Sequence, residues 1–171
     1  MSASSDLTAL DVAAGVRGGR LAATAVVGAA LERIAQADPG LNCFTGVFAD
    51  RALRSAREID DAVGQGRDPG PLAGVPFAVK NLYDVEGEVT LAGSVIERDR
   101  PPASRDATLV ERLGAAGAVL VGALNMDEYA YGFTTENSHY GPARNPHDPT
   151  RVAGGSSGGS AASGRSGCSR W

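Results

Sequence analysis

The chain has 171 residues, of which 43% are hydrophobic and 21% are charged, as in an ordinary globular protein with one core. The formal net charge of -4 lacks the basic excess typical of nucleic-acid binding, and no apolar run approaches the ~20 residues of a membrane span. Cys43 and Cys168 form no CxxC pair, and the first residues lack the basic and apolar blocks of a signal peptide. These features predict a cytoplasmic protein with reduced thiols.

The first part of the chain is predicted to be helical. Apolar residues repeat with a helical period from Leu7 to Ile34, with a break at Gly18-Gly19 that is typical of a helix end. Thr24 is the predicted N-cap of the second helix, and Asp38-Pro39-Gly40 is its predicted stop. We therefore expect a helical part at residues 5–36.

Residues 41–162 are predicted to form an α/β core. The expected strands are Leu41–Phe48, Val75–Val79 and Ala118–Val121. The expected helices are Ala49–Val63 and Asp106–Ala116. Apolar strands that repeatedly follow helices indicate an α/β sheet covered by helices.

Lys80 lies where chemistry is often found in such folds. It directly follows the predicted strand Val75–Val79, at the strand end where α/β sheets commonly bind ligands. Partial burial there would lower the pKa of its amine and let it act as a neutral base. A lysine at this position is also typical of an exposed loop, and its spacing alone favours that interpretation.

The segment Gly154–Ser160 has the sequence Gly-Gly-Ser-Ser-Gly-Gly-Ser and overlaps a predicted ordered loop at Thr134–Gly159. Its glycines leave backbone amide groups open to an anion or an oxyanion. A flexible linker has a similar composition, although a linker does not normally lie between segments such as Arg151–Ala153 and Ala161-Ala162. A phosphate-binding loop lacks support because its Gly-Lys-Ser/Thr ending is absent. Composition alone favours neither a catalytic or anion-binding loop nor a linker.

Two other groups carry ionisable side chains. Asp127 and Glu128 can act as an acid–base pair, but adjacent acids are more typical of the first turn of a helix, where they interact favourably with its dipole. His139 and His147 have no further ligand at metal-binding spacing, so no metal site is expected. No cofactor is expected either.

An ordered set of short segments resembles the amidase signature family. The segments are Gly74–Asn81, Arg105–Thr108, Ala115–Ala118, Asn125–Tyr129, Asn145-Pro146 and Gly154–Ala162. Each is weak evidence alone, but the set is specific and spans about residues 5–162. The run Leu124–Asn137 most resembles amidohydrolases of the biuret and carboxybiuret type, and the A subunit of glutamyl-tRNA amidotransferase is nearly as similar. The resemblance implies the N-terminal portion of the amidase-signature fold, a mixed sheet covered by helices.

The resemblance implies a Ser–cis-Ser–Lys catalytic arrangement. Lys80 matches the family lysine, and Ser156 matches the bridging serine, which follows a cis peptide bond. Neutral Lys80 would take a proton from Ser156 while Ser156 takes one from a nucleophilic serine. An acyl-enzyme then forms on a small amide or urea-like substrate, and water hydrolyses it. The loop residues around Ser156 are Gly155, Ser157, Gly158 and Gly159, with Ser157 expected to support the loop by hydrogen bonding.

The nucleophilic serine of the family has no match in this sequence. The resemblance places it beyond Trp171, where the chain ends, so the chain alone is expected to be inactive. Residues 163–171 have no apolar periodicity and form an atypical tail. GC-rich codons for Ser-Gly-Cys-Ser-Arg-Trp can be read one frame over as Gly-Leu-Leu-Pro-Leu, which resembles the family here. A frameshift is therefore one hypothesis for the tail.

The resemblance also implies a partner. Both similar subgroups work with a small helical partner subunit, so a partner of that kind is expected, with no nucleic acid and no membrane. Two other functions stay open. One is a non-catalytic remnant that binds a partner through the N-terminal helices, and the other is an anion- or nucleotide-binding module built on the Gly/Ser loop.

Overall fold

A mixed sheet lies at the centre of the computed structural model, which describes residues 7–165. Its strands are β1 (Phe44–Val47), β2 (Pro76–Lys80) and β3 (Val119–Leu124). The middle strand, β3, runs parallel to β2 and antiparallel to β1. A separate two-stranded sheet pairs β4 (Glu136–Asn137) with β5 (Gly141–Pro142).

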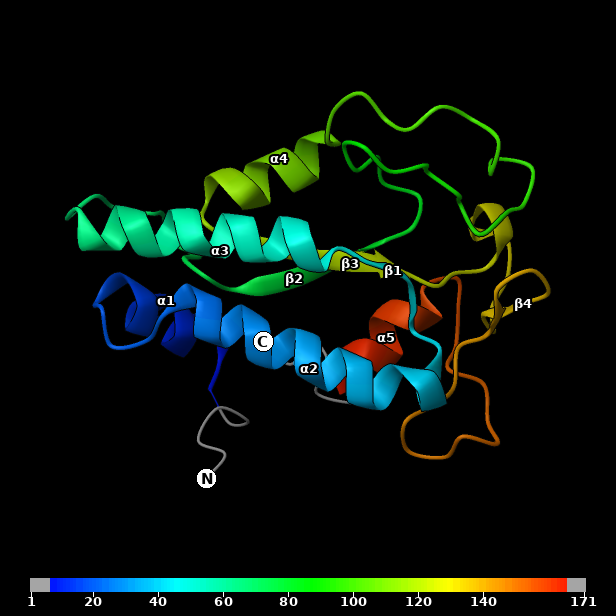
Figure 1. The fold of residues 1–171 in the computed structure, drawn as a ribbon. Coiled ribbons are helices and arrows are strands. Elements are labelled where there is room, and N and C mark those ends of the chain that lie inside the picture. The colour runs from blue at the N-terminus through cyan, green and yellow to red at the C-terminus, as the bar shows by residue number, and fades with distance from the viewer. Residues whose placement is uncertain (1–6, 166–171) are drawn as a thin grey trace.

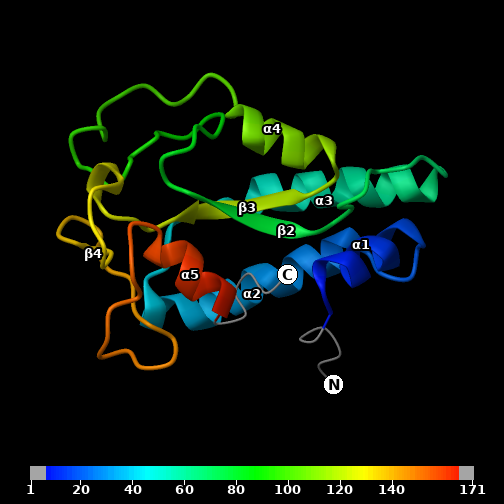
Figure 2. The same ribbon diagram turned by 180° about the vertical axis from the view of Figure 1, so that it is seen from behind.

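Helices cover both faces of this sheet. They are α1 (Ala9–Arg17), α2 (Ala23–Leu41), α3 (Ala49–Gly64), α4 (Thr108–Ala115) and α5 (Gly158–Arg165), with a short 3-10 turn, η1, at Glu128–Ala130. α4 lies on one side of the sheet, and α1, α2 and α5 lie on the other (Figure 1, Figure 2). α3 packs against both α2 and β3. The expected α/β fold, a mixed sheet covered by helices, is confirmed.

The side chains of β2 alternate between two apolar clusters. Ala78 packs against the larger cluster, which includes residues of α1, α2 and α3. Phe77 and Val79 pack against the smaller cluster, with Val110 of α4. Because successive side chains of a strand point to opposite faces, Lys80 lies on the same face as Ala78. This is the face on which α5 packs.

The start of α2 differs from the prediction. Thr24 is not the N-cap, because the helix already begins at Ala23 and Ala22 precedes it without a side-chain cap. Asp60 of α3 supplies the missing acceptor. Its carboxylate accepts hydrogen bonds from the Ala23 and Thr24 N–H groups at 2.6 and 3.0 Å and from the Thr24 hydroxyl at 2.7 Å. A cap that comes from 36 residues away leaves no local signal in the sequence.

The end of α2 also differs from the prediction. The helix does not stop at Asp38 but runs through the exposed Pro39 to Leu41, so the helical part is longer than residues 5–36. Asn42 closes it in a left-handed conformation, with its N–H bonded to the Asp38 carbonyl at 2.7 Å. The Asp38 carboxylate accepts hydrogen bonds from the backbone at the start of β1, which ties the helix end to the sheet.

Two further boundaries differ from the predicted ones. β2 is Pro76–Lys80 rather than Val75–Val79, so Lys80 is the last residue of the strand. The atypical tail does not begin at residue 163, because α5 continues to Arg165 and Ser163 is fully buried within it. Glycine and serine have low helix propensity, which explains why this helix was not predicted. Residues 1–6 and 166–171 lie outside the described residues. The structure therefore does not test the signal-peptide prediction, the state of Cys168 or the frameshift hypothesis, which concern those residues. From residue 7 to 165, every helix is too short or too polar to cross a membrane.

The long-range cap of α2 can be tested by substitution. Asp60→Ala removes all three hydrogen bonds at the start of the helix, and Asp61→Ala removes an adjacent, exposed carboxylate as a control. We expect D60A to lower the free energy of unfolding by about 1–2 kcal/mol in urea denaturation. D61A should change it by less than ~0.5 kcal/mol. Equal losses in the two variants would contradict this cap.

Candidate active site

Lys80 and Ser156 lie in contact although 76 residues separate them in the sequence. Lys80 ends β2, and Ser156 lies just before α5 on the same side of the sheet. Lys80 Nζ donates a hydrogen bond to Ser156 Oγ at 2.7 Å, and the peptide bond between Gly155 and Ser156 is cis. Both side chains are half-buried, so the contact stays partly open to solvent.

The surroundings of Lys80 lower the pKa of its amine. Burial lowers the pKa of Lys80 below the usual 10.5, and the negative charge of Asp127 opposes this effect in part. A lysine with a lowered pKa is more often unprotonated near neutral pH and can accept a proton from a hydroxyl group. The structure therefore gives Lys80 the environment of a base, which an exposed loop lysine would not have.

Thr135 links the two ends of the loop that carries Ser156. Its buried hydroxyl donates to the Gly154 carbonyl and accepts from the Gly158 N–H group, each at 2.9 Å. Thr135 has φ of 54°, which is unusual for a β-branched residue. Such a conformation persists where surrounding contacts hold it. One buried side chain thus holds the backbone on both sides of the serine.

Gly159 is required by close contact with the backbone. A Cβ at this position would lie 2.5 Å from the Cys43 carbonyl oxygen and 2.6 Å from the Asn125 carbonyl oxygen. The Gly159 N–H group donates to that Asn125 carbonyl at 3.1 Å. Together with the bond from Gly158 to Thr135, this engages two of the amide groups that an anion-binding loop would present.

The side chain of Asp127 contacts the same loop rather than the helical turn that follows it. Asp127 precedes η1, but its side chain makes no capping hydrogen bond there. Its Oδ1 accepts a hydrogen bond from the Thr135 N–H group at 2.9 Å, and its own N–H donates to the Ser156 carbonyl at 3.2 Å. Only 7% of Asp127 is exposed, and within residues 7–165 its Oδ2 is buried without a hydrogen-bond partner. The pair therefore does lie at the start of a helical turn, with Asp127 at the N-cap position and Glu128 in the first turn, but the Asp127 side chain binds the loop instead of the turn.

Glu128 and the histidines lie apart from this site. Glu128 is partly exposed and lies 3.3 Å from His139 Nε2, so it does not form a carboxylate pair with Asp127. In the described part of the chain, no three histidine, cysteine, aspartate or glutamate side chains are grouped as metal ligands would be.

Ser157 supports the loop through its backbone rather than its side chain. Its carbonyl accepts a hydrogen bond from the Ala161 N–H group at 3.1 Å, whereas its hydroxyl has no partner between residues 7 and 165. Thr135 provides the side-chain support expected of Ser157.

Sequence reasoning missed the roles of Thr135 and Asn125. Asn125 is fully buried, and its amide donates to the carbonyls of Asn42 and Gly141 at 3.1 and 3.0 Å. The only local signal for either residue was its place in or beside a polar, glycine-rich stretch. Their partners come from distant parts of the chain, so the sequence alone could not reveal them.

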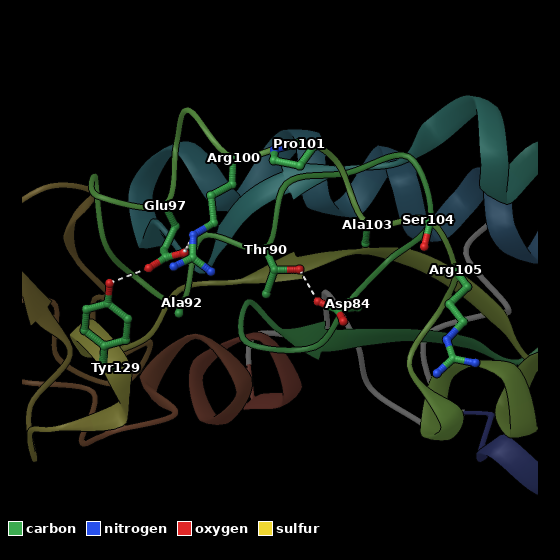
Figure 3. A pocket seen from close by; sticks show the side chains of 10 residues that line it. All are labelled: Asp84, Thr90, Ala92, Glu97, Arg100, Pro101, Ala103, Ser104, Arg105 and Tyr129. Carbon is green, nitrogen blue, oxygen red and sulfur yellow. Dashed lines mark hydrogen bonds and ion pairs between the residues drawn. The ribbon is translucent and has the colours of Figure 1, made fainter.

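A hollow of about 640 Å³ lies between the segments around residues 84–92 and 97–105 (Figure 3). Glu97 on its wall accepts a hydrogen bond from the Tyr129 hydroxyl at 2.6 Å and pairs with Arg100 at 2.5 Å. Asp84 accepts from the Thr90 hydroxyl at 2.5 Å. Lys80 and Ser156 do not line this hollow, so it is separate from the candidate site.

The lysine–serine contact at the end of a sheet strand, beside a glycine-rich cis turn, is the arrangement expected of an amidase signature hydrolase. The model of the amidase family matches residues 25–165, so the chain belongs to the amidase family. AtzE of Pseudomonas sp. (strain ADP), which is one subunit of 1-carboxybiuret hydrolase, is 56% identical over 153 residues, or 90% of this chain and 34% of that protein. The A subunit of the glutamyl-tRNA(Gln) amidotransferase of Acidothermus cellulolyticus is 47% identical over 156 residues, or 91% of this chain and 30% of that protein.

A solved structure agrees with these sequence relatives. It is described as a vestigial protein complex that reveals the origins of an s-triazine catabolic enzyme. It matches with a TM-score of 0.93 and 54% identity, covering 95% of this chain and 35% of that one. The chain therefore spans about a third of the length of the relatives it matches. The predicted similarity to the carboxybiuret and amidotransferase subgroups is confirmed.

The role of Thr135 can be tested with two substitutions. Thr135→Val keeps the shape but leaves the Gly158 N–H and the Gly154 carbonyl unpaired, whereas Thr135→Ser retains the hydroxyl. We expect T135V to lower the free energy of unfolding by about 1–3 kcal/mol and to speed hydrogen exchange at the Gly158 amide. T135S should keep that amide protected. Equal protection of Gly158 in both variants would argue against the bridging hydroxyl.

Proposed function

We propose that Lys80 and Ser156 form the N-terminal part of the catalytic site of a hydrolase that cleaves C–N bonds in small amide or urea-like substrates. The contact of 2.7 Å between Lys80 Nζ and Ser156 Oγ carries this proposal. Membership of the amidase family and the lowered pKa of Lys80 support it. The nucleophilic serine would come from the part of an amidase domain that follows α5.

In the proposed mechanism, Ser156 passes protons between the nucleophilic serine and Lys80. Neutral Lys80 takes a proton from Ser156 as Ser156 takes one from the nucleophilic serine, whose oxygen attacks the carbonyl carbon of the substrate. The proton then returns through Ser156 to the departing nitrogen as the C–N bond breaks, which leaves an acyl-enzyme. Water attacks the ester, gives its proton to the same relay, and releases the acid and the free serine.

We infer that residues 7–165 cannot complete this reaction by themselves. They would supply the base and the bridging hydroxyl but not the nucleophile. Loss of the nucleophile of a catalytic unit costs about as much activity as loss of the whole unit. The 171-residue chain alone should therefore show no amide hydrolysis.

The relatives support a substrate class and a partner. The identity of 56% to one chain of a 1-carboxybiuret hydrolase supports a small urea-like acid as substrate. Both sequence relatives are named as subunits, and the matching structure is of a protein complex. We therefore propose that the whole protein works with a small helical partner subunit.

A chimeric enzyme tests the catalytic proposal. It joins residues 1–160 of this chain to the part of AtzE that follows the matching region, since the match covers only 34% of AtzE. We expect it to hydrolyse 1-carboxybiuret, and we expect Lys80→Met and Ser156→Ala each to lower kcat/KM by about 10³-fold or more. Ser157→Ala is the matched control and should keep most of the activity, because its hydroxyl makes no hydrogen bond between residues 7 and 165.

Circular dichroism and thermal unfolding would show which chimeras are folded. A folded chimera that keeps its activity in the S156A or K80M form would contradict the proposed roles. Greater activity after addition of the partner chain of the s-triazine enzyme complex would support the proposed partner.

A further inference from the structure

We propose that Asp127 is a positioning residue of this site: its carboxylate supports Gly155 and supplies the negative charge beside Lys80, so that Ser156 is held against the lysine. The inference rests on the proposed function of Lys80 and Ser156. It assigns a role to a buried side chain that the proposed proton relay does not use.

The carboxylate of Asp127 lies between two glycines. A Cβ on Gly155 would overlap Asp127 Oδ2, and a Cβ on Gly132 would lie 2.5 Å from Asp127 Cγ. Both glycines are thus needed to make room for this carboxylate. Because Gly155 directly precedes Ser156, this contact sets the position of the backbone from which the serine hydroxyl projects.

Hydrogen bonds fix Asp127 itself against the loop. Its N–H group donates to the Ser156 carbonyl at 3.2 Å, and its Oδ1 accepts from the Thr135 N–H group at 2.9 Å. Thr135 in turn binds Gly154 and Gly158. Asp127 thus contacts the residue before the serine through its side chain and the serine itself through its backbone.

The second carboxylate oxygen has an unusual environment. Oδ2 is buried, and among residues 7–165 it has no hydrogen-bond partner. A buried charge is costly unless another charge or a hydrogen bond compensates it. The Asp127 charge acts on Lys80, whose pKa it raises against the effect of burial. When Lys80 takes the proton of Ser156, the fixed negative charge stabilises the ammonium group that forms.

The helices and the strand that pack against β2 carry few other ionisable groups. β3 carries none, and α5 carries Arg165 at the end remote from Ser156. α2 carries Glu32, which is exposed, Arg33, which is half-buried, and Asp38, which is bound to backbone N–H groups at the start of β1. Asp127 is therefore the carboxylate whose substitution should change the titration of Lys80.

The test uses the intact 171-residue chain. Lys80 is its single lysine, so labelling with [ε-¹³C]lysine gives one side-chain signal to follow by NMR against pH. Asp127→Asn keeps the size and the Oδ1 acceptor but removes the charge. We expect the pKa of Lys80 to fall in D127N, because the charge that raises it is gone. The control Glu128→Gln removes a neighbouring, more exposed carboxylate and should leave the pKa unchanged. An unchanged Lys80 titration in folded D127N would overturn the proposal.

A second measurement needs no substitution at Asp127. In the wild-type chain, the ¹³Cγ signal of Asp127 should shift at the pH where Lys80 titrates, and this inflection should vanish in Lys80→Met. An Asp127 signal that does not respond to Lys80 overturns the proposal even if D127N fails to fold. Neither measurement depends on hydrolysis. If Lys80 and Asp127 affect each other's signals as expected but the chimera is inactive, the proposed function is rejected and the contact between the two residues is not.

Discussion

The hydrogen bond from Lys80 Nζ to Ser156 Oγ joins two distant parts of the chain, and the architecture around it holds each end. The alternation of side chains along β2 determines the direction of Lys80, because Phe77 and Val79 face one apolar cluster and Lys80 faces the opposite side of the sheet. The serine end lies on a glycine-rich loop, which has many accessible conformations of its own. The loop keeps one conformation because buried polar groups bind its backbone.

Small residues make this binding possible. The absence of a Cβ at Gly159 lets the loop approach backbone carbonyls of two other segments, and its absence at Gly155 makes room for the Asp127 carboxylate. Thr135 fills the space beneath and bonds to both ends of the turn. The glycines that resemble a flexible linker in composition therefore allow close packing. The proposed proton relay through Ser156 requires that rigidity.

Parts of this structure were predictable from the sequence, and the reasons differ from element to element. α3 and β3 follow from clear apolar patterns, and their expected ranges are close to the observed ones. The contact between Lys80 and Ser156 was expected only from the family resemblance, because spacing alone favoured an exposed lysine. Asp60 as the cap of α2 and Asp127 as the support of Gly155 were not predictable, since Thr24 and Gly155, on which they act, lie far away in the sequence. The final turn of α5 was missed because its glycine and serine residues have low helix propensity.

A crystal structure of the 171-residue chain tests most directly whether buried polar groups hold Ser156 against Lys80. We predict clear density for residues 154–158, with Ser156 Oγ at hydrogen-bonding distance from Lys80 Nζ. The Asp127 carboxylate should lie against Gly155, and the Thr135 hydroxyl should bridge Gly154 and Gly158. A well-ordered loop in which Ser156 points away from Lys80, or in which Asp127 turns toward solvent, would contradict this arrangement.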